Sequence, residues 1–330
     1  MKGILSTIGN TPLVELDRIY PEFPGGIYAK LERFNPGGSI KDRTAVAMLR
    51  ESIRSGTLVP GRSTVVESSS GNLAIGLAQV CRYHGIRFVC VVDAKTTEHN
   101  LALLGALGAE IVRVTEPDAA TGEYLLQRLR RVRELVDSIP HAFWPNQYAN
   151  LLNPRAHHET MREIVEALGA EPDYLLCATS TTGTLRGCAE YLREHGMATR
   201  VVAVDAVGST LFSDGPARRR LIPGHGASVR PPLLDRELPA RVVHVTDLDC
   251  VVACRRMSAR EAMLVGGSSG ATVAALGKLI PLIPPDSTCV LIQPDGGDRY
   301  LDTIYSDSWV HTHFGDISYL WKESEGNAEC

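Results

Sequence analysis

The sequence lacks a long apolar run and a strong excess of charge of either sign. Residues 1–6 contain no apolar core like that of a signal peptide, and no later apolar run reaches the length of a membrane span. The formal net charge of -4 leaves no basic footprint for nucleic acid, although residues 128–133 are locally basic. We therefore expect a soluble, cytoplasmic protein that binds neither a membrane nor nucleic acid.

The sequence also lacks the residue spacing of a metal site. Its eight cysteines are scattered without a CxxC pair, and we interpret them as reduced thiols that lie mostly in the core. His157, His158 and Glu159 are adjacent, but adjacent side chains on a helix do not converge on one face. We therefore expect no metal.

Strand-like and helix-like segments alternate along most of the 330 residues. Expected strands lie at 26–32, 63–67, 87–92, 110–114, 174–178, 200–205, 242–245 and 288–293. Expected helices lie at 44–49, 73–83, 98–107, 122–138, 185–195 and 271–276. This alternation is typical of βαβ units and predicts an α/β fold with parallel sheets. The proline-containing tract 138–147 breaks the alternation, and the long segment 211–241 is predicted to be a functional loop.

Residues 35–43 join an expected strand to an expected helix. Ser39 is the expected N-cap, which places Lys41 in the first helical turn. There the helix dipole and partial burial disfavour the ammonium form, so the pKa of the lysine falls and its amine becomes a nucleophile. Such an amine can hold a carbonyl group as a Schiff base. The alternative is a surface lysine that pairs with Asp42 or Glu32.

Three loops at strand-to-helix junctions are expected to complete a site around Lys41, because open α/β sheets bind ligands at the carboxyl ends of their strands. Residues 179–184 combine hydroxyl groups with a helix start, which suits a phosphate dianion. Residues 68–72 offer the same donors to a carboxylate, and Asn72 can donate its amide to a ring oxygen. Either loop is as readily explained as a capped turn.

The third loop is Gly266–Gly270, in which Ser268 is surrounded by glycines. A serine hydroxyl is a weak partner for a pyridine nitrogen and leaves the ring largely unprotonated, which suits β-elimination better than transamination. Glycines permit close backbone approach to a flat ring. The alternative is a plain flexible turn.

A lysine nucleophile, a phosphate cradle, an asparagine donor and a serine beside glycines together imply pyridoxal phosphate. With Ile8–Leu13, these motifs resemble the fold-type II pyridoxal phosphate enzymes of the cysteine synthase and cystathionine β-synthase family. The resemblance implies a two-domain fold like tryptophan synthase β, with three αβα layers around mostly parallel sheets, and a homodimer. It also implies that a smaller domain, 38–146, is inserted in a larger one made of 1–37 and 147–330.

The resemblance assigns roles to individual residues. The Schiff-base lysine falls on Lys41, the ring-oxygen asparagine on Asn72 and the pyridine-nitrogen serine on Ser268. The phosphate loop falls on Ser180, Thr181, Thr182, Gly183 and Thr184. The loop that holds the substrate α-carboxylate falls on Ser69, Ser70 and Asn72.

Three segments, 69–73, 146–150 and 180–184, depart from the usual cysteine synthase pattern. They resemble instead a siderophore-pathway branch of the family that joins O-phospho-L-serine to L-glutamate, with release of phosphate, toward L-2,3-diaminopropionate. His225 departs from that branch, in which an isoleucine is usual. The alternatives are a cysteine synthase that uses sulfide with O-acetylserine or O-phosphoserine, and a catalytically idle member that serves as a scaffold.

L-glutamate would bring two carboxylates to the site, so a nearby cation would help to bind it. Arg128 and Tyr148 are the candidates for binding the anionic groups of the substrates. The alternative for Arg128 is a place on a solvated arginine face of its helix.

Overall fold

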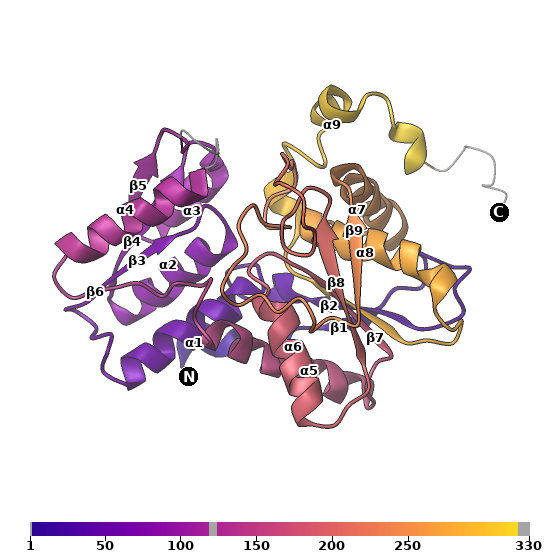
Figure 1. Cartoon of the computed structure of the whole chain (residues 1–330), viewed down its shortest axis with the longest axis horizontal. Helices are drawn as coiled ribbons and strands as arrows, with labels where there is room; N and C mark the ends of the chain where they lie inside the picture. Colours follow the sequence, from indigo (N-terminus) through magenta and orange to yellow (C-terminus); the bar gives the residue numbers. More distant parts are fainter. Residues whose placement is uncertain (1, 119–123, 323–330) are drawn as a thin grey trace. The chain divides into compact units, whose positions relative to one another are not determined.

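The structure, a computed structural model, describes residues 2–118 and 124–322 (Figure 1). Two compact units are distinguished by their internal contacts, and each is described by itself. Unit 1 contains Met1–Asn10 and Asn35–His157, and unit 2 contains Thr11–Phe34 and His158–Cys330. That residues 38–146 form an inserted domain stays a prediction.

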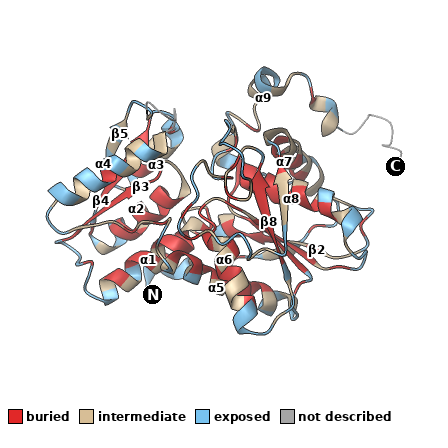
Figure 2. Ribbon diagram, viewed as in Figure 1, coloured by how far each residue is buried: buried red, intermediate tan, exposed pale blue. Residues whose placement is uncertain are grey.

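Unit 1 is built on a four-stranded parallel sheet in the order β5-β4-β3-β6. The strands are β3 (Thr64–Ser68), β4 (Arg87–Asp93), β5 (Glu110–Val114) and β6 (Ala142–Phe143). The helices are α1 (Lys41–Arg54), α2 (Asn72–His84), α3 (Glu98–Ala106) and α4 (Tyr124–Ser138). The central strands are buried on both faces, as Figure 2 shows, which explains their continuous apolar runs.

Alternate residues of the unit 1 strands face different helices. Val65 and Phe88 belong to a core cluster that includes residues of α1, α2 and α3, whereas Val66 and Val89 cluster with Val132 of α4. Successive side chains of a strand point to opposite faces of the sheet. Three helices therefore lie on one face of this sheet and α4 lies on the other.

Unit 2 is built on a six-stranded sheet in the order β1-β2-β10-β7-β8-β9, in which only the pairing of β1 with β2 is antiparallel. The strands are β1 (Leu13–Glu15), β2 (Ile27–Leu31), β7 (Tyr174–Ala178), β8 (Arg200–Ala206), β9 (Arg241–Val245) and β10 (Cys289–Gln293). The helices are α6 (Gly183–Glu194), α7 (Asp247–Glu261), α8 (Gly267–Leu279) and α9 (Asp307–Phe314). Helix α5 (Leu152–Leu168) crosses from unit 1 into unit 2.

Helix α8 packs on β7, β8, β9 and β10, and α7 packs on α8 (Figure 1). Residues 207–240 form neither helix nor strand, as the sequence predicted for most of this segment. Each expected strand is present, and the predicted α/β fold with parallel sheets is confirmed. The expected helix 122–138 is confirmed from Tyr124 onward, and its first two residues lie outside the described part of the chain.

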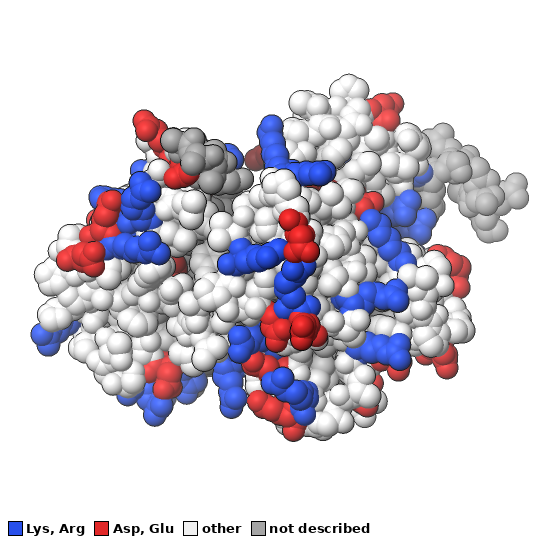
Figure 3. Space-filling view, viewed as in Figure 1, with Lys and Arg blue, Asp and Glu red and all other residues white. Residues whose placement is uncertain are grey.

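Acidic and basic side chains are interspersed over the molecular face drawn in Figure 3, in keeping with the small net charge. Within the two described ranges, none of the helices combines the length and the apolar character that a membrane span needs. The described residues also include no group of three His, Cys, Asp or Glu side chains placed to hold a metal ion.

Candidate active site

Lys41 is the first residue of α1, so its predicted place in the first helical turn is confirmed. The prediction of Ser39 as the N-cap is wrong by one residue, because Ile40, with helical backbone angles, occupies that position. The Ser39 hydroxyl nevertheless accepts a hydrogen bond from the Lys41 backbone N–H at 3.2 Å. It satisfies one of the donors that a helix start leaves open, although it does so from outside the cap position.

The Lys41 side chain is half-buried, and burial lowers the pKa of its amine from 10.5 to about 8. Lys41 forms no ion pair with any residue that the structure describes. Asp42 instead accepts a hydrogen bond from the Gly37 N–H, and Glu32 accepts one from the Thr11 hydroxyl at 2.8 Å. These contacts disfavour the surface-pair alternative and leave an amine that loses its proton readily.

The segment Ser68–Asn72, here called the α2 loop, connects β3 to the start of α2. The Ser69 hydroxyl accepts a hydrogen bond from the Ala74 N–H at 3.2 Å, and the Asn100 amide donates to the Ser70 carbonyl at 2.9 Å. Ser69 is buried, whereas Ser70 and Asn72 are half-buried. The protein therefore fixes the loop, and its helix N-terminus suits a carboxylate.

Arg128 of α4 contacts the α2 loop directly. Its Nη1 donates to the Ser70 hydroxyl at 3.3 Å, and its Nε lies 3.3 Å from Asp93 Oδ2. The Arg128 side chain is only 12% exposed, whereas Arg130 and Arg131 are exposed. Arg128 therefore does not belong to the solvated arginine face that was its alternative.

Tyr148 is half-buried and lies near the charges of Arg128 and Glu67. Burial raises the pKa of its hydroxyl, the Arg128 cation opposes that rise, and Glu67 adds to it. Unit 1 thus brings Ser69, Ser70, Arg128 and Tyr148 into one polar region.

Residues Ser180–Thr184 form the α6 loop, which follows β7 and contains the start of α6 at Gly183. Thr182 has a positive φ of 64°, which is uncommon for a β-branched residue. Its side chain is buried, and its hydroxyl has no hydrogen-bond partner within 2–118 and 124–322. An unsatisfied hydroxyl at a helix N-terminus fits a bound phosphate.

Ser268 lies in the first turn of α8, because the helix begins at Gly267. The prediction of a loop over Gly266–Gly270 is therefore wrong after its first residue. A Cβ on Gly266 would lie 1.8 Å from Oδ1 of Asp295, which follows β10, so any larger residue before this helix would have to displace that buried side chain. Ser269 donates to the Asp295 carbonyl at 3.3 Å, which fixes the turn that holds Ser268.

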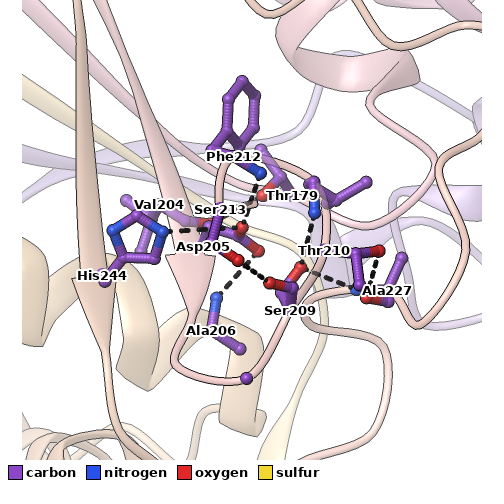
Figure 4. Close-up of polar contacts among 12 residues, drawn as sticks. Thr179, Val204, Asp205, Ala206, Ser209, Thr210, Phe212, Ser213, Ala227 and His244 are labelled. Carbon is purple, nitrogen blue, oxygen red and sulfur yellow. Dashed lines mark hydrogen bonds and ion pairs between the residues drawn. The ribbon is translucent and has the colours of Figure 1, made fainter. Parts of the chain in front are cut away.

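The long loop 207–240 returns to the start of the α6 loop (Figure 4). Asp205 at the end of β8 accepts a hydrogen bond from the Phe212 N–H, and Ser209 accepts one from the Ala227 N–H. The Gly226 N–H donates to the Thr179 carbonyl at 2.7 Å. These contacts place the loop beside the residues that precede Ser180.

His225, next to Gly226, is buried, and neither of its ring nitrogens has a hydrogen-bond partner in the described part of the chain. Burial, aided by the Arg220 cation, lowers its pKa to about 3. The imidazole is therefore neutral. Nothing in the structure explains a histidine at this position.

Glu67, the residue just before the α2 loop, was not predicted to belong to the site. It is completely buried in β3, and its carboxylate accepts hydrogen bonds from the N–H groups of Ser68, Trp144 and Gln147. The available signal was an acidic residue after two valines at the end of a predicted strand, directly before a predicted binding loop.

The residues of each unit fit pyridoxal phosphate. Unit 1 supplies a readily deprotonated amine at Lys41 and an amide at Asn72, and unit 2 supplies the unsatisfied Thr182 hydroxyl and Ser268 at helix starts. These groups match an aldehyde, a ring oxygen, a phosphate and a pyridine nitrogen respectively.

Comparison with known proteins agrees with this fit. The family model described as pyridoxal-phosphate dependent enzyme matches residues 4–295. The chain is 46% identical over 310 residues to N-(2-amino-2-carboxyethyl)-L-glutamate synthase from Ralstonia nicotianae, covering 94% of this chain and 91% of that protein.

Solved structures show the same relationship. An O-ureido-L-serine synthase is 33% identical with a TM-score of 0.86, covering 93% of this chain and 98% of that one. A cysteine synthase from Entamoeba histolytica is 31% identical with a TM-score of 0.85, covering 92% and 90%. The chain therefore belongs to the family of pyridoxal-phosphate dependent enzymes, in which it is a transferase of the cysteine synthase type.

Proposed function

We propose that the protein joins O-phospho-L-serine to L-glutamate by β-replacement and releases phosphate. The product is N-(2-amino-2-carboxyethyl)-L-glutamate, a precursor of L-2,3-diaminopropionate. The glutamate nitrogen forms a bond to the β-carbon of the serine substrate, and the bond from that carbon to the phosphate oxygen breaks. The phosphate leaves with both electrons of the bond, and the glutamate nitrogen loses a proton.

The observation that carries the proposal is the buried guanidinium of Arg128 at the Ser70 hydroxyl. A guanidinium has five N–H donors, so the contacts with Ser70 and Asp93 leave others for an anionic ligand. Both proposed substrates carry such groups. The 46% identity to the Ralstonia enzyme over most of both chains supports the same reaction.

In this proposal Lys41 holds the cofactor and then acts as the general base. Bound pyridoxal phosphate supplies a sink for the negative charge that develops at the α-carbon of the serine substrate. The Lys41 amine, whose pKa burial lowers to about 8, takes the α-proton at Nζ and later returns it. A lysine with its ordinary pKa would hold its own proton too tightly at neutral pH.

The α2 loop would bind the α-carboxylate through Ser69, Ser70 and Asn72, so that the β-carbon is oriented toward the incoming amine. Arg128 and Tyr148 would bind the remaining anionic groups of the two substrates. The fixed backbone of this loop supports such a role, since Ala74 and Asn100 bond to it.

Five residues of the α6 loop, Ser180, Thr181, Thr182, Gly183 and Thr184, would hold the cofactor phosphate. Ser268 would accept or donate a hydrogen bond at the pyridine nitrogen. The homodimer that the resemblance implied and the cytoplasmic location expected from the sequence are part of the same proposal.

The test is the absorption spectrum of the bound cofactor during addition of O-phospho-L-serine and then of L-glutamate. We expect the first substrate to shift the cofactor band and the second to restore it, with little restoration by sulfide in a parallel sample. Restoration by sulfide alone would identify a cysteine synthase. No shift with either phosphorylated or acetylated serine would identify an idle scaffold.

The cysteine synthase stays the second candidate because the solved enzyme from Entamoeba histolytica shares the fold with a TM-score of 0.85. The buried arginine suits the carboxylate of the serine substrate in either candidate. The 46% identity to the Ralstonia enzyme favours the first.

A further inference from the structure

Glu67 is a buried acid whose position the proposed reaction does not by itself explain. It lies in β3, all five residues of which are buried, and it is itself completely inaccessible to solvent. A carboxylate in such a place is costly unless it is paired or hydrogen-bonded. Within the described residues, no lysine or arginine forms an ion pair with it.

Three N–H groups, together with the Asn146 backbone N–H, take the place of a counter-ion. The Ser68 backbone N–H and the Trp144 indole N–H donate to Oε1 at 2.7 and 3.0 Å, and the Gln147 backbone N–H donates to Oε2 at 3.3 Å. All three groups can only donate. An ionised carboxylate, which can only accept, is the matching partner.

The donors belong to two segments that are far apart in the sequence. Ser68 is the first residue of the α2 loop, whereas Trp144 and Gln147 belong to the segment 144–150, which also carries Tyr148. Both segments contain residues assigned above to substrate binding. The carboxylate of Glu67 therefore connects the two parts of unit 1 that the proposed substrates would contact.

We propose that Glu67 is a positioning residue whose carboxylate holds the α2 loop and the segment 144–150 in the geometry that binds the substrate carboxylates. The identity of those substrates rests on the proposed function. The connection between the two segments does not, because it is made by contacts within unit 1 alone.

The surroundings of Glu67 make this connection sensitive to pH. The titratable groups whose charges interact with Glu67 are the Cys90 thiol on β4 and the Tyr148 hydroxyl in the segment 144–150, and both of them also interact with the Arg128 cation on α4. Burial raises the pKa of Glu67 to about 7, although its hydrogen bonds lower it. Protonation would place an O–H among N–H donors, so the connection is expected to weaken below about pH 7.

The first experiment measures the connection itself by amide hydrogen exchange of the holoenzyme. Glu67→Gln places an NH₂ group against the N–H donors, and Glu67→Asp keeps an acceptor-only group on a shorter side chain. Glu110→Gln makes the same chemical change on β5, where Glu110 forms an exposed ion pair with Arg87 of β4, and serves as the control. We expect exchange in both 68–74 and 144–150 to be about tenfold faster for Glu67→Gln, faster by a smaller factor for Glu67→Asp, and unchanged for Glu110→Gln. Wild-type exchange in either segment of Glu67→Gln would overturn the proposal.

The second experiment separates positioning from mere stability. We expect Glu67→Gln to raise KM for O-phospho-L-serine about tenfold while kcat changes much less, with partial rescue in Glu67→Asp. The wild-type KM should rise as the pH is lowered from 8 to 6, whereas the KM of Glu67→Gln should stay the same. Equal KM values and parallel pH profiles would contradict the proposal.

The two experiments keep the proposals apart. If the wild-type enzyme does not turn over O-phospho-L-serine, the proposed function fails and hydrogen exchange still decides the role of Glu67. If Glu67→Gln does not fold, exchange in Glu67→Asp and in the wild type at pH 6 and 8 decides it. Protection that is the same at both pH values and in both proteins would overturn the proposal.

Discussion

The loop before α2 and the loop before α6 have similar compositions, but the protein treats their hydroxyl groups differently. In the α2 loop the Ser69 hydroxyl accepts from a backbone N–H and the Ser70 hydroxyl accepts from Arg128. In the α6 loop the Thr182 hydroxyl is buried, and it has no partner among the residues that the structure describes. Ser68, the first residue of the α2 loop, likewise has a buried hydroxyl without a partner among the described residues. The loops therefore differ in that the protein holds the Ser69 and Ser70 hydroxyls of the first, whereas no such bond to a described residue holds Thr182 in the second.

Their backbones differ in the same sense. Gly71 precedes α2 with a negative φ of -140°, whereas Thr182 precedes α6 with a φ of +64°. A positive φ costs a β-branched residue roughly 1–3 kcal/mol and persists where the surrounding structure imposes it. A pre-formed anion site is a reason to retain such a conformation.

The largest effect on turnover is expected at Lys41. Replacing Lys41 with alanine removes the only group proposed to hold the cofactor covalently and to move the α-proton. We expect turnover to fall by at least about 1000-fold, measured as phosphate release from O-phospho-L-serine. Lys278→Ala, which removes an exposed lysine paired with Asp249, is the matched control. Turnover that survives Lys41→Ala would rule out this mechanism.

Ionisation of Glu67 is expected to strengthen its contacts with the α2 loop but to lower the stability of the whole protein. The pKa of Glu67 is raised from 4.5 to about 7 in the folded state. The stability that this group contributes is therefore complete below about pH 4.5 and is lost as pH rises through 7. At 1.36 kcal/mol per unit, the loss is of order 3 kcal/mol.

Urea unfolding of the wild type and of Glu67→Gln at pH 5 and pH 8 measures this loss. We expect the difference in unfolding free energy between the two proteins to favour the variant more at pH 8 than at pH 5. A difference that does not change with pH would show that Glu67 has an ordinary pKa.

Replacing Arg128 of α4 removes the cation that contacts the α2 loop. Arg128→Ala is expected to raise KM for O-phospho-L-serine or L-glutamate by about ten- to a hundredfold, because a charged hydrogen bond is lost. Arg131→Ala removes an exposed arginine one turn further along α4. Steady-state kinetics of the two variants should differ sharply, and equal KM values would return Arg128 to a purely structural role.

The smallest expected effect concerns the α6 loop. Thr182→Val removes the unsatisfied hydroxyl and keeps the shape of the side chain. We expect the affinity for pyridoxal phosphate to fall several-fold to about tenfold, while the stability of the apoprotein stays the same or rises slightly. Thr199→Val, which removes another hydroxyl without a partner in the described residues, should leave cofactor affinity unchanged. Equal affinities in the two variants, measured by cofactor titration, would remove the contrast between the loops.

The sequence predicted the parts of the site that depend on local order along the chain. Lys41 was placed in a helical turn because a glycine-rich turn and a serine precede it, and that placement is confirmed. The start of α8 was missed because Gly267 and Gly270 are poor helix formers. The structure explains that start by the approach of Asp295 to Gly266, a contact between distant parts of the chain.

Contacts between distant segments also explain the other two differences. Periodicity places Arg128 on a helix that is rich in arginine, but only Asp93 and Ser70 show that its side chain points inward. Glu67 interrupts a buried strand, and its partner Trp144 lies 77 residues away. Helix α7 was also not predicted, although the Thr246–Asp249 capping box that begins it was visible in the sequence.

A competition between the two nucleophiles in one vessel decides between the proposed reaction and cysteine synthesis. Purified holoenzyme receives O-phospho-L-serine with equal concentrations of L-glutamate and sulfide, and the products are counted by mass spectrometry. We expect N-(2-amino-2-carboxyethyl)-L-glutamate to predominate and one phosphate to be released for each molecule formed. Cysteine as the sole product would contradict the proposed reaction.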